Sequence, residues 1–583
     1  MDPITAKLMS AAGAAADPVY VDDVFSTFLW EGNSTNNRAI ANGIDLSGEG
    51  GLTWIKLRSG SDNHILYDTE RGGSKFISSD STAAENSNDG LTFNSNGFTI
   101  AVNSQAYTNA NGSDYCSWTF RKAPGFFDVV TYTGNGSHRD ISHSLGSEPG
   151  SIWIKRTDGD ESWIVYHRSL DQGGGSGGTA HMAGLELEST GAQYGGTLRW
   201  SASGGGEDHT ATTFHVSGHS AINGNNMTYV AYIFAHDEQS FGDAGNEAII
   251  HCGSYTANES TSGVEVNCGF EAQWVIIKRS SGTGNWIVND TMRGFSASTN
   301  INSPANGNQA KILKANTNNS ETTGRTIIGT PTGFKLTSTD TDLGGNNQDY
   351  IYIAIAKPNK PPETGSEVFN TDIGDSTLSG GVEFQAGFPV DMYVWRNIEG
   401  GGSGFQQSHN VITRKYQKNA LATNRLEDMN YLYTPGNEAL LDNNVGAYAG
   451  TLNSEYCAWM WRTAPGFFDV TNYWNGNDTN NRNIPHNLRA VPKMIWIKSI
   501  KDDDSSDRDW TIYHAALGNA NKLELNNSTA AVSTGDFNST TPTATNFTVA
   551  AEASVNVNAK YIAFVFGEIS GVSKMGSYTG NGS

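Results

Sequence analysis

The sequence predicts an all-β protein, built as a tandem array of about five antiparallel β-sandwiches behind a short N-terminal arm. Residues 115–129 return as residues 456–470, 341 positions later (456 minus 115), with Cys, Trp, Arg and an Ala-Pro-Gly-Phe-Phe-Asp block in register. Runs of Val, Ile, Tyr, Phe and Trp alternate with clusters of Gly, Asn, Ser and Thr, which is typical of short strands joined by turns. Helical periodicity is confined to residues 4–16.

An apolar strand that ends in a basic residue sets the number of sandwiches. The basic residue of each copy stands at Lys56, Lys155, Lys278, Arg396 and Lys498. The copies lie roughly 100–120 residues apart, which is the size of one small β-sandwich with its own core. In three copies a second Trp follows, at Trp163, Trp286 and Trp510.

The order of these motifs divides the chain into sandwiches of types a, b, c, a′ and b′. We place an N-terminal anchoring arm at 1–27, a at 28–129, b at 130–248, c at 249–364, a′ at 365–470, b′ at 471–572, and a truncated further unit at 573–583. Residues 576–583 match the opening of c at 253–260, so we expect a longer polypeptide; the alternative is a true terminus with a leftover strand. Five sandwiches in series should form an extended rod.

The strand that contains Trp153 and Lys155 has two interpretations. Side chains alternate faces along a strand, so Trp153 and Lys155 share the face opposite Ile152 and Ile154. An exposed Trp beside a Lys could stack on a sugar ring, which makes Trp153, Lys155 and their repeat equivalents Trp496 and Lys498 candidate carbohydrate-binding residues. The alternative is that Trp153 packs against a neighbouring unit while Lys155 extends to solvent. We favour packing, because the pattern recurs in every unit and a binding site need not recur.

The Ala-Pro-Gly-Phe-Phe-Asp block is interpreted as a clamp between successive sandwiches rather than as a ligand site. Its Pro-Gly pair predicts a turn. We expect the aromatic members to be buried and each Arg to pair with the Asp of its own copy. The residues concerned are Trp118, Arg121, Phe127 and Asp128 in the first copy and Trp459, Arg462, Phe468 and Asp469 in the second.

Two acidic loops are candidate calcium sites. Asp340 and Asp342 in one loop, and Asp502 and Asp504 in the other, place several oxygen ligands in a short span, as hard cations require. Neither loop has the glycine and terminal glutamate of the twelve-residue calcium loop. Solvated acidic turns are the favoured interpretation, and no other cofactor is expected.

The cysteines and histidines favour packing roles. Four cysteines in 583 residues do not form a disulfide scaffold. Cys116 and Cys457 are repeat equivalents beside aromatic residues, which indicates buried thiols, whereas Cys252 and Cys268 could pair. His143 and His486 are repeat equivalents, as are His167 and His514, and such recurrence again favours packing.

Charge and motifs argue against several classes of function. The formal charge of −23 disfavours nucleic-acid binding, which needs a basic surface. No apolar run approaches the length that spans a bilayer, and the N-terminus lacks a secretory signal. We find no metalloprotease, nucleophile-elbow or phosphate-loop motif, so we expect no enzyme. Chance pairs of carboxylates keep a carbohydrate-active enzyme as an alternative of another class.

Several of these segments resemble one family. The sequence Gly-Ser-Tyr-Thr-Gly-Asn-Gly-Ser at 576–583, the apolar-Trp-Ile-Lys strand and the start at residues 4–27 resemble repeat modules in tail-fibre and other virion proteins of marine, cyanophage-like bacteriophages. The likeness covers nearly the whole chain. It implies jelly-roll sandwiches of the concanavalin, lectin-like type.

The resemblance implies a structural component of a virion. The main interpretation is a tail fibre or appendage with a role in attachment to host-surface glycans; the alternative is a capsid decoration or head-fibre protein. Such a protein is made in the host cytoplasm and ends on the tail or capsid exterior. The N-terminal arm would bind other virion proteins, and cyclic symmetry favours a homotrimer. A glycan-release assay would separate these interpretations from the enzyme.

Overall fold

The structure is a computed structural model dominated by β-strands. It describes residues 17–88, 90–101, 105–170, 183–195, 200, 209–258, 263–295, 310–325, 327–336, 340–374, 382–398, 410–413, 417–418, 439–442, 456–474, 480–500, 508–557 and 560–581. Strands make up 43% and helices 3% of the residues. The predicted all-β class is therefore confirmed. The predicted helix at 4–16 lies outside the described residues.

Five larger sheets share one antiparallel strand order. In each, the first strand of a sandwich pairs with its last strand, the last strand pairs with the Trp-Lys strand or its equivalent, and that strand pairs with the next one along the chain. The orders are β1-β9-β3-β4, β10-β15-β12-β13, β16-β24-β18-β19-β20-β21, β25-β31-β27-β28-β29 and β32-β39-β34-β35-β36-β37. We call the corresponding units sandwiches a, b, c, a′ and b′.

The first lobe contains sandwiches a, b and c. Sandwich a comprises α2 (Val21–Val24), β1 (Phe25–Glu31), β2 (Arg38–Ile40), β3 (Gly51–Leu57), β4 (Ile65–Asp68), β5 (Lys75–Phe76), β6 (Asn86–Ser87), β7 (Leu91–Asn94), β8 (Gly97–Ile100), α3 (Gln105–Thr108) and β9 (Asp114–Arg121). Sandwich b comprises β10 (Phe127–Thr133), β11 (Arg139–Ser142), β12 (Ser151–Arg156), β13 (Ile164–His167), β14 (Thr213–Val216), α4 (Ser220–Asn223) and β15 (Thr228–Phe234). Sandwich c comprises β16 (Ile250–Thr256), β17 (Val264–Asn267), β18 (Ala272–Arg279), β19 (Trp286–Asp290), β20 (Ala310–Lys314), β21 (Thr322–Arg325), β22 (Ile327–Thr330), β23 (Gly333–Leu336) and β24 (Asp349–Ala356).

The second lobe contains sandwiches a′ and b′. Sandwich a′ comprises η3 (Gly365–Glu367), β25 (Phe369–Gly374), β26 (Val382–Gln385), β27 (Met392–Asn397), β28 (Asn410–Thr413), β29 (Gln417–Lys418), β30 (Ala439–Asp442) and β31 (Tyr456–Trp461). Sandwich b′ comprises β32 (Phe468–Trp474), β33 (Arg482–Pro485), β34 (Met494–Ile500), β35 (Thr511–His514), β36 (Asn521–Glu524), β37 (Val532–Ser533), β38 (Asn546–Val549) and β39 (Lys560–Phe566). Strands β1, β10 and β32 each begin three residues before the predicted starts at 28, 130 and 471, and each begins at a Phe.

Each larger sheet of the first lobe buries both of its faces. In sandwich a, Ile55 of β3 faces the small sheet β2-β8-β7 and belongs to the core between the two sheets. Its neighbour Trp54 points the other way, into a second core that extends from Val21 to Ala356 and is shared by a, b and c. This is why every residue of β3 is buried. Successive side chains of one strand serve two different cores.

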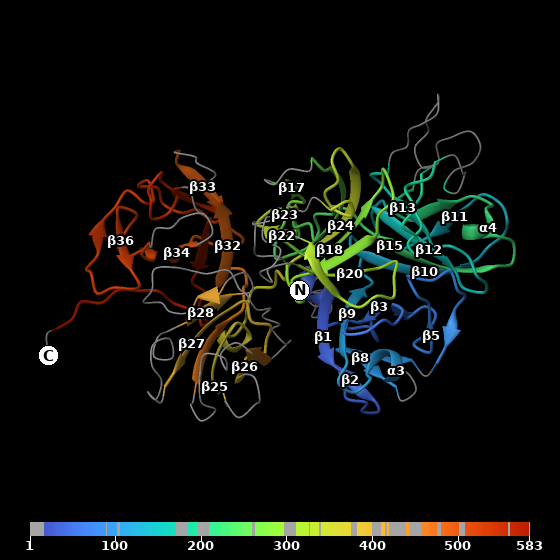
Figure 1. Ribbon diagram of the computed structural model, residues 1–583, viewed down its shortest axis with the longest axis horizontal. Helices are drawn as coiled ribbons and strands as arrows, with labels where there is room; N and C mark the ends of the chain where they lie inside the picture. Colours follow the sequence, from blue (N-terminus) through green and yellow to red (C-terminus); the bar gives the residue numbers. More distant parts are fainter. Residues whose placement is uncertain are drawn as a thin grey trace, which may run out of the picture.

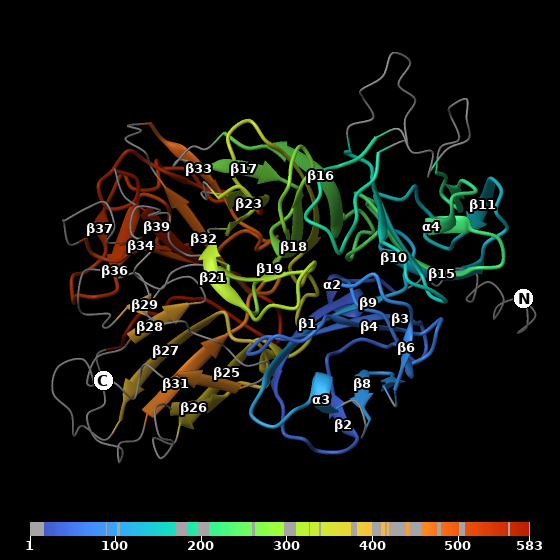
Figure 2. The same cartoon turned by 45° about the vertical axis from the view of Figure 1, so that its right-hand side comes forward.

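The sandwiches are grouped in two lobes, so the predicted extended rod is wrong. Figure 1 shows a, b and c clustered together, with a′ and b′ beside them as a second body. In Figure 2 the sheets of a and b lie against each other, and Trp54 of a contacts Trp153 of b with ring centroids 6.0 Å apart. A smaller core holds a′ and b′ together. The Trp side chains lie on the outer face of their sheet, and the neighbouring sandwiches bury them.

The turn between successive sandwiches repeats as expected. Gly125 and Gly466 follow the repeated Pro and have φ values of +74° and +75°, which favour glycine. The N-terminal arm differs from the prediction in its last residues. Val21 and Val24 of α2 are completely buried and belong to the core of the first lobe. The end of the predicted arm of 1–27 therefore contributes to the core of the first lobe.

Candidate functional site

Three buried lysines connect each sandwich of the first lobe to another one. They lie near the ends of the equivalent strands β3, β12 and β18. Each ammonium donates to a backbone carbonyl of a neighbouring sandwich: Lys56 of a to Asn318 of c at 3.2 Å, Lys155 of b to Thr82 of a at 3.1 Å, and Lys278 of c to Thr190 of b at 3.1 Å. The contacts run in a closed cycle, so the three sandwiches form a ring.

Burial sets the electrostatics of these lysines. It lowers the pKa of Lys155 and of Lys278 to about 8, and it also lowers the pKa of Lys56. Each Nζ has a second carbonyl partner within its own sandwich, such as Arg156 O at 2.9 Å from Lys155. Two carbonyl dipoles stabilise the ammonium form, which compensates part of the desolvation cost.

The second Trp motif makes further contacts at the joints of the ring. Trp163 Nε1 of b donates to Ser78 O of a, and Trp286 Nε1 of c donates to Glu186 O of b, both at 2.9 Å. In sandwich a, His64 occupies this position, with Nε2 3.0 Å from Lys314 O of c. The recurrence of the Trp-Lys strand and of the second Trp thus reflects contacts between sandwiches.

Two histidines at the joints are held neutral. Trp54 Nε1 donates to His64 Nδ1 at 2.9 Å, so Nε2 carries the proton and donates to the carbonyl of Lys314. His167 of b has the same arrangement: Ser169 N donates to Nδ1, and Nε2 lies 3.0 Å from Tyr352 O of c. Burial lowers the pKa of His64 well below its usual range and that of His167 to about 4.

Two Asp-Arg pairs complete the joints, and our sequence analysis missed them. Asp68 and Arg71 form an ion pair of 2.6 Å behind β4, and Asp68 also accepts a hydrogen bond from Tyr232 of b at 2.8 Å. The equivalent pair in c is Asp290 with Arg293 at 2.6 Å, and Asp290 accepts from Trp118 Nε1 of a at 3.0 Å. Both pairs lie in the sequence Asp-Thr-x-Arg-Gly, at 68–72 and 290–294. That repeated motif was the available signal.

The candidate carbohydrate-binding residues do not form an open surface. Trp153, Lys155 and Lys498 are completely buried, and Trp496 is half-buried. Trp153 packs on Trp54 and on Phe234, so its ring has no free face for a sugar. The structure favours the packing interpretation for Trp153. Lys155, however, is enclosed by carbonyl groups and does not extend to solvent.

The aromatic block forms core, but its expected ion pairs are wrong. Trp118, Phe127 and Phe468 are completely buried, and Trp459 is half-buried. Asp128 pairs with Lys122 at 3.3 Å, and not with Arg121. In the second copy, Asp469 pairs with Lys357 at 2.6 Å and Arg462 pairs with Asp22 at 2.7 Å. The cations that reach these carboxylates come from other positions: Lys122 directly follows β9, and Lys357 follows β24 of sandwich c.

The candidate calcium ligands that the structure describes accept hydrogen bonds from nearby protein groups. Asp342 accepts two hydrogen bonds from Asn285, at 2.8 and 3.0 Å, and Asp340 accepts from the backbone of Asp342 at 2.7 Å. Asp502 and Asp504 lie outside the described residues. The possible disulfide is absent: Cys252 and Cys268 are both buried thiols.

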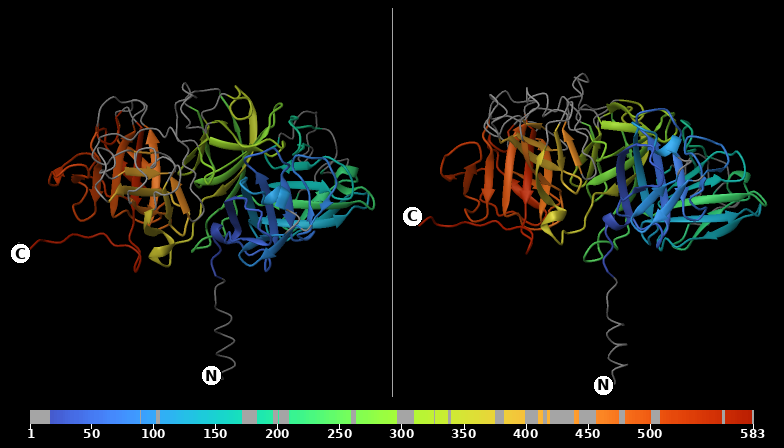
Figure 3. Two further views of the ribbon diagram at one scale, coloured as in Figure 1. Left: turned by 60° about the horizontal axis from the view of Figure 1, so that its bottom comes forward. Right: turned by 90° about the horizontal axis from the view of Figure 1, so that it is seen from below.

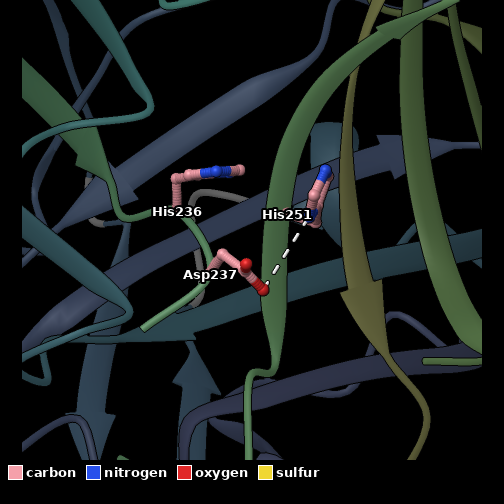
Figure 4. A group of neighbouring side chains, drawn as sticks. All are labelled: His236, Asp237 and His251. Atoms are coloured by element: carbon pink, nitrogen blue, oxygen red, sulfur yellow. Dashed lines mark ion pairs between the residues drawn. The ribbon is translucent and has the colours of Figure 1, made fainter. Parts of the chain in front are cut away.

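Among the described residues, one group of side chains comes close enough to share a metal ion. It consists of His236, Asp237 and His251, whose ligand atoms lie within 4.8 Å of one another at the joint of b and c (Figure 4). Cys252 N donates to His236 Nδ1, which leaves the proton of the neutral ring on Nε2, so neither nitrogen of His236 has a free lone pair. Burial, and to a smaller extent the charge of Arg168, lowers the pKa of both histidines, and the Arg168 charge would repel a cation. The group does not fit a metal site.

A cavity of about 550 Å³ lies between the two lobes. Its apolar wall includes Phe25, Met292 and Phe388. Charged groups at its edge are already paired, as Asp22 is with Arg462. Thr27 also lines the cavity, and its hydroxyl is buried without a hydrogen-bond partner. This combination of aromatic and polar lining is typical of pockets for small polar ligands.

Comparison with known proteins gives one family. A family model described as "Domain of unknown function (DUF7483)" matches residues 21–359 and 442–583, which together make up most of the chain. The chain belongs to this family. No curated protein matches it.

The first DUF7483 stretch coincides with the ring. It begins at Val21, in α2, and ends at Asn359, just after β24. The two ends are hydrogen-bonded: Val21 N donates to Asn359 Oδ1 at 2.8 Å, and Asn359 N donates to Asp22 at 3.0 Å. In this chain the first DUF7483 stretch thus contains the three sandwiches together. Among the described residues, no helix combines the length and apolar character needed to cross a bilayer.

Proposed function

We propose that this DUF7483 chain is a structural component of a bacteriophage virion, most simply a tail fibre or similar appendage. The observation that carries the proposal is the closed ring of the first lobe, in which three sandwiches share one continuous core. Buried polar contacts at all three joints would have to break before the sandwiches separate. Such a unit suits a load-bearing particle component, and the resemblance of the repeat modules supports the virion setting.

The N-terminal residues are the proposed anchor to the particle. Val21 to Val24 belong to the ring, which leaves residues 1–16 as the segment available for a virion partner or a sister chain. We propose a homotrimer, with each arm docked equivalently. A capsid decoration is the alternative location, and cryo-microscopy of the intact particle distinguishes tail from capsid.

The test compares two truncations in particles. Deletion of residues 1–16 should leave the melting temperature unchanged and abolish incorporation, as measured by mass spectrometry of purified virions. Deletion of 1–24 should also lower the melting temperature, because it removes buried side chains. Normal copy number of the shorter deletion in virions would contradict the anchor. Absence of the full-length protein from virions would contradict the function itself.

A second candidate function is attachment to a host-surface glycan at the cavity between the lobes. The specific observation is the mixed lining of this cavity, to which the aromatic Phe25 and Phe388 and the polar Thr27 contribute. Binding to an immobilised glycan panel tests it, with Ser26→Phe to fill the cavity and Thr133→Phe, on an exposed strand end, as control. Loss of binding in the first variant alone is expected. Equal binding by both variants would contradict this location.

A further inference from the structure

The second lobe repeats two of the three sandwiches of the ring. Sandwiches a′ and b′ correspond to a and b by strand order and pairing register. In the first lobe, sandwich c covers one face of both a and b. Among the described residues of the second lobe, no third sandwich occupies that position (Figure 3).

Sandwich a′ exposes the face that c covers in sandwich a. Leu29 of β1 pairs with Cys116, and Ile373 of β25 pairs with Cys457 at the same register. Leu29 is 7% exposed, whereas Ile373 is 59% exposed. Cys116 is completely buried, and Cys457 is half-buried. The same difference separates Thr27, which is buried, from exposed Thr371.

Sandwich b′ shows the same difference on its side of the face. The sequence Leu185-Glu-Leu-Glu of b corresponds to Leu523-Glu-Leu-Asn of b′, because Glu188 and Asn526 accept hydrogen bonds from the backbone of the equivalent Trp163 and Trp510. Leu187 is completely buried, whereas Leu525 is 38% exposed. His167 is 1% exposed, and its equivalent His514 is half-buried.

The contacts of c show what has to cover this face. Asp290 of c accepts from Trp118 beside Cys116, and Trp286 of c donates to the carbonyl of Glu186 beside Leu187. An aromatic and aliphatic surface with a buried Asp-Arg pair therefore matches the face. That is the chemistry of a c-type sandwich.

A segment of this chain carries the first strand of such a sandwich. Residues 576–583 repeat residues 253–260, where Tyr255 of β16 is 8% exposed and stacks on Tyr350 of β24. The equivalent Tyr578 is 95% exposed, and residues 576–581 extend away from the lobe in Figure 1. Val572 and Met575, which precede it, already pack against the core of a′ and b′.

We propose that the exposed face of a′ and b′, marked by Ile373, Cys457 and Leu525, docks a third sandwich of the c type whose first strand is the segment 576–583. The docked sandwich closes a second ring equivalent to a-b-c. It buries the thiol of Cys457 as sandwich c buries that of Cys116. This interface does not depend on where in a virion the protein resides.

Thiol labelling of the 583-residue protein tests the proposal, with Cys116, Cys252 and Cys268 as buried internal references. Cys457 should react at least about tenfold faster than these three, as expected for a partly exposed group. A second protein carries residues 261–364 of c after Ser583, which extends the strand segment into a complete sandwich. In it, the labelling rate of Cys457 should fall about tenfold or more.

Two variants of the extended protein make the outcome specific. Ile373→Asp should restore fast labelling, because a buried carboxylate opposes docking. Tyr107→Asp, at an exposed position of sandwich a, should leave the protection intact. Fast labelling of Cys457 in the extended protein would overturn the proposal. Protection of Cys457 in a dimer of the 583-residue protein would also overturn it, because a second copy would then be the occupant.

Discussion

Asp290 illustrates how single residues close the ring. Its carboxylate pairs with Arg293 of its own sandwich and accepts a hydrogen bond from Trp118 of sandwich a, and neither charged side chain is exposed to solvent. Removing one member of a buried ion pair leaves an uncompensated charge. Asp290 therefore stabilises the joint mainly by compensating the buried charge of Arg293.

We expect Asp290→Asn to reduce the free energy of unfolding by about 3–5 kcal/mol, because the buried Arg293 guanidinium would lose its partner at 2.6 Å and keep only Glu321 at 3.4 Å. Urea unfolding followed by Trp fluorescence measures the change. Asp158→Asn is the matched control, since its ion pair with Arg156 is partly exposed and should contribute about 0–1 kcal/mol. Equal effects of the two substitutions would contradict the role of Asp290.

We expect Phe127→Ala to cost about 3–5 kcal/mol, which is the usual range for a buried aromatic side chain. Phe127 is completely buried and contacts Phe120, Tyr232 and Phe234 across the joint of a and b. The melting temperature measures the loss. The same substitution at exposed Tyr107 should change it little, and an unchanged melting temperature for Phe127→Ala would reverse the packing interpretation.

Residue roles could be predicted from sequence where they depend on local pattern. The burial of Trp118 and Phe127 follows from aromatic residues in a repeated strand. The partners of Asp128 and Asp469 could not be predicted in this way, because Lys122 lies on the other side of a turn and Lys357 belongs to another sandwich. Contacts between distant segments produce no regular residue spacing from which such ion pairs could be predicted.

At the scale of elements, the recurring strand was predicted but its double burial was not. A sequence of alternating Trp and Ile shows that both faces are apolar. It does not show that one face is covered by the sandwich's own small sheet and the other by a neighbouring sandwich. The repeat Asp-Thr-x-Arg-Gly at the ends of β4 and β19 could have indicated that a neighbouring sandwich covers the second face, since buried pairs at equivalent positions require an equivalent environment.

The joint between β13 and β24 should weaken in acid. His167 has a pKa of about 4 in the folded protein because of burial, and about 6.5 when unfolded. As the pH falls below 6.5 the unfolded chain binds a proton that the folded chain rejects, so stability decreases by about 1.4 kcal/mol per pH unit for this group, until the pH reaches about 4.

His167→Asn tests this pH dependence, because Asn keeps a donor and an acceptor but does not titrate. Urea unfolding between pH 7 and 4 should show a shallower loss of stability than in the parent protein. His514→Asn, the same substitution at the equivalent half-buried position of b′, is the control. A parallel slope in all three proteins would contradict the assignment.

At the scale of the whole molecule, polar contacts hold the two lobes in one arrangement. Asp22 of α2 pairs with Arg462 of a′ at 2.7 Å, and Lys357 at the end of c pairs with Asp469 of b′ at 2.6 Å. The Lys357 charge lowers the pKa of the Asp469 carboxyl despite its burial. Lys357 and Asp469 are thus expected to remain paired at neutral pH, whereas the more exposed pair of Asp22 is open to screening by salt.

We expect Asp22→Ala to weaken the contact between the two lobes without unfolding either lobe. It removes the Arg462 contact and an acceptor for the backbone of Asn359 and Lys360. Small-angle X-ray scattering should show a larger radius of gyration, and high salt should produce part of the same change in the parent protein. Asp17→Ala, at an exposed neighbouring position, is the control; an unchanged radius for Asp22→Ala would contradict the role.

The arrangement of the lobes is the level that sequence analysis predicted least well. Repeat number and order do not distinguish a rod from a ring, because both use the same sandwiches in the same sequence. The difference depends on whether the outer face of each larger sheet finds a partner, as Trp153 does on Trp54. Contacts between residues about a hundred positions apart determine whether such a partner is found, and no local sequence pattern predicts these contacts.

The hydrogen bond between Val21 and Asn359 also bears on the connectivity of the ring. With its two ends side by side, the ring has no structural first or last sandwich; the order a, b, c records only where the chain enters and leaves. A circular permutant that joins residue 359 to residue 21 and opens between b and c would contain the same joints and the same core. The chain could therefore enter and leave the ring at any of its three joints without changing which sandwiches contact each other.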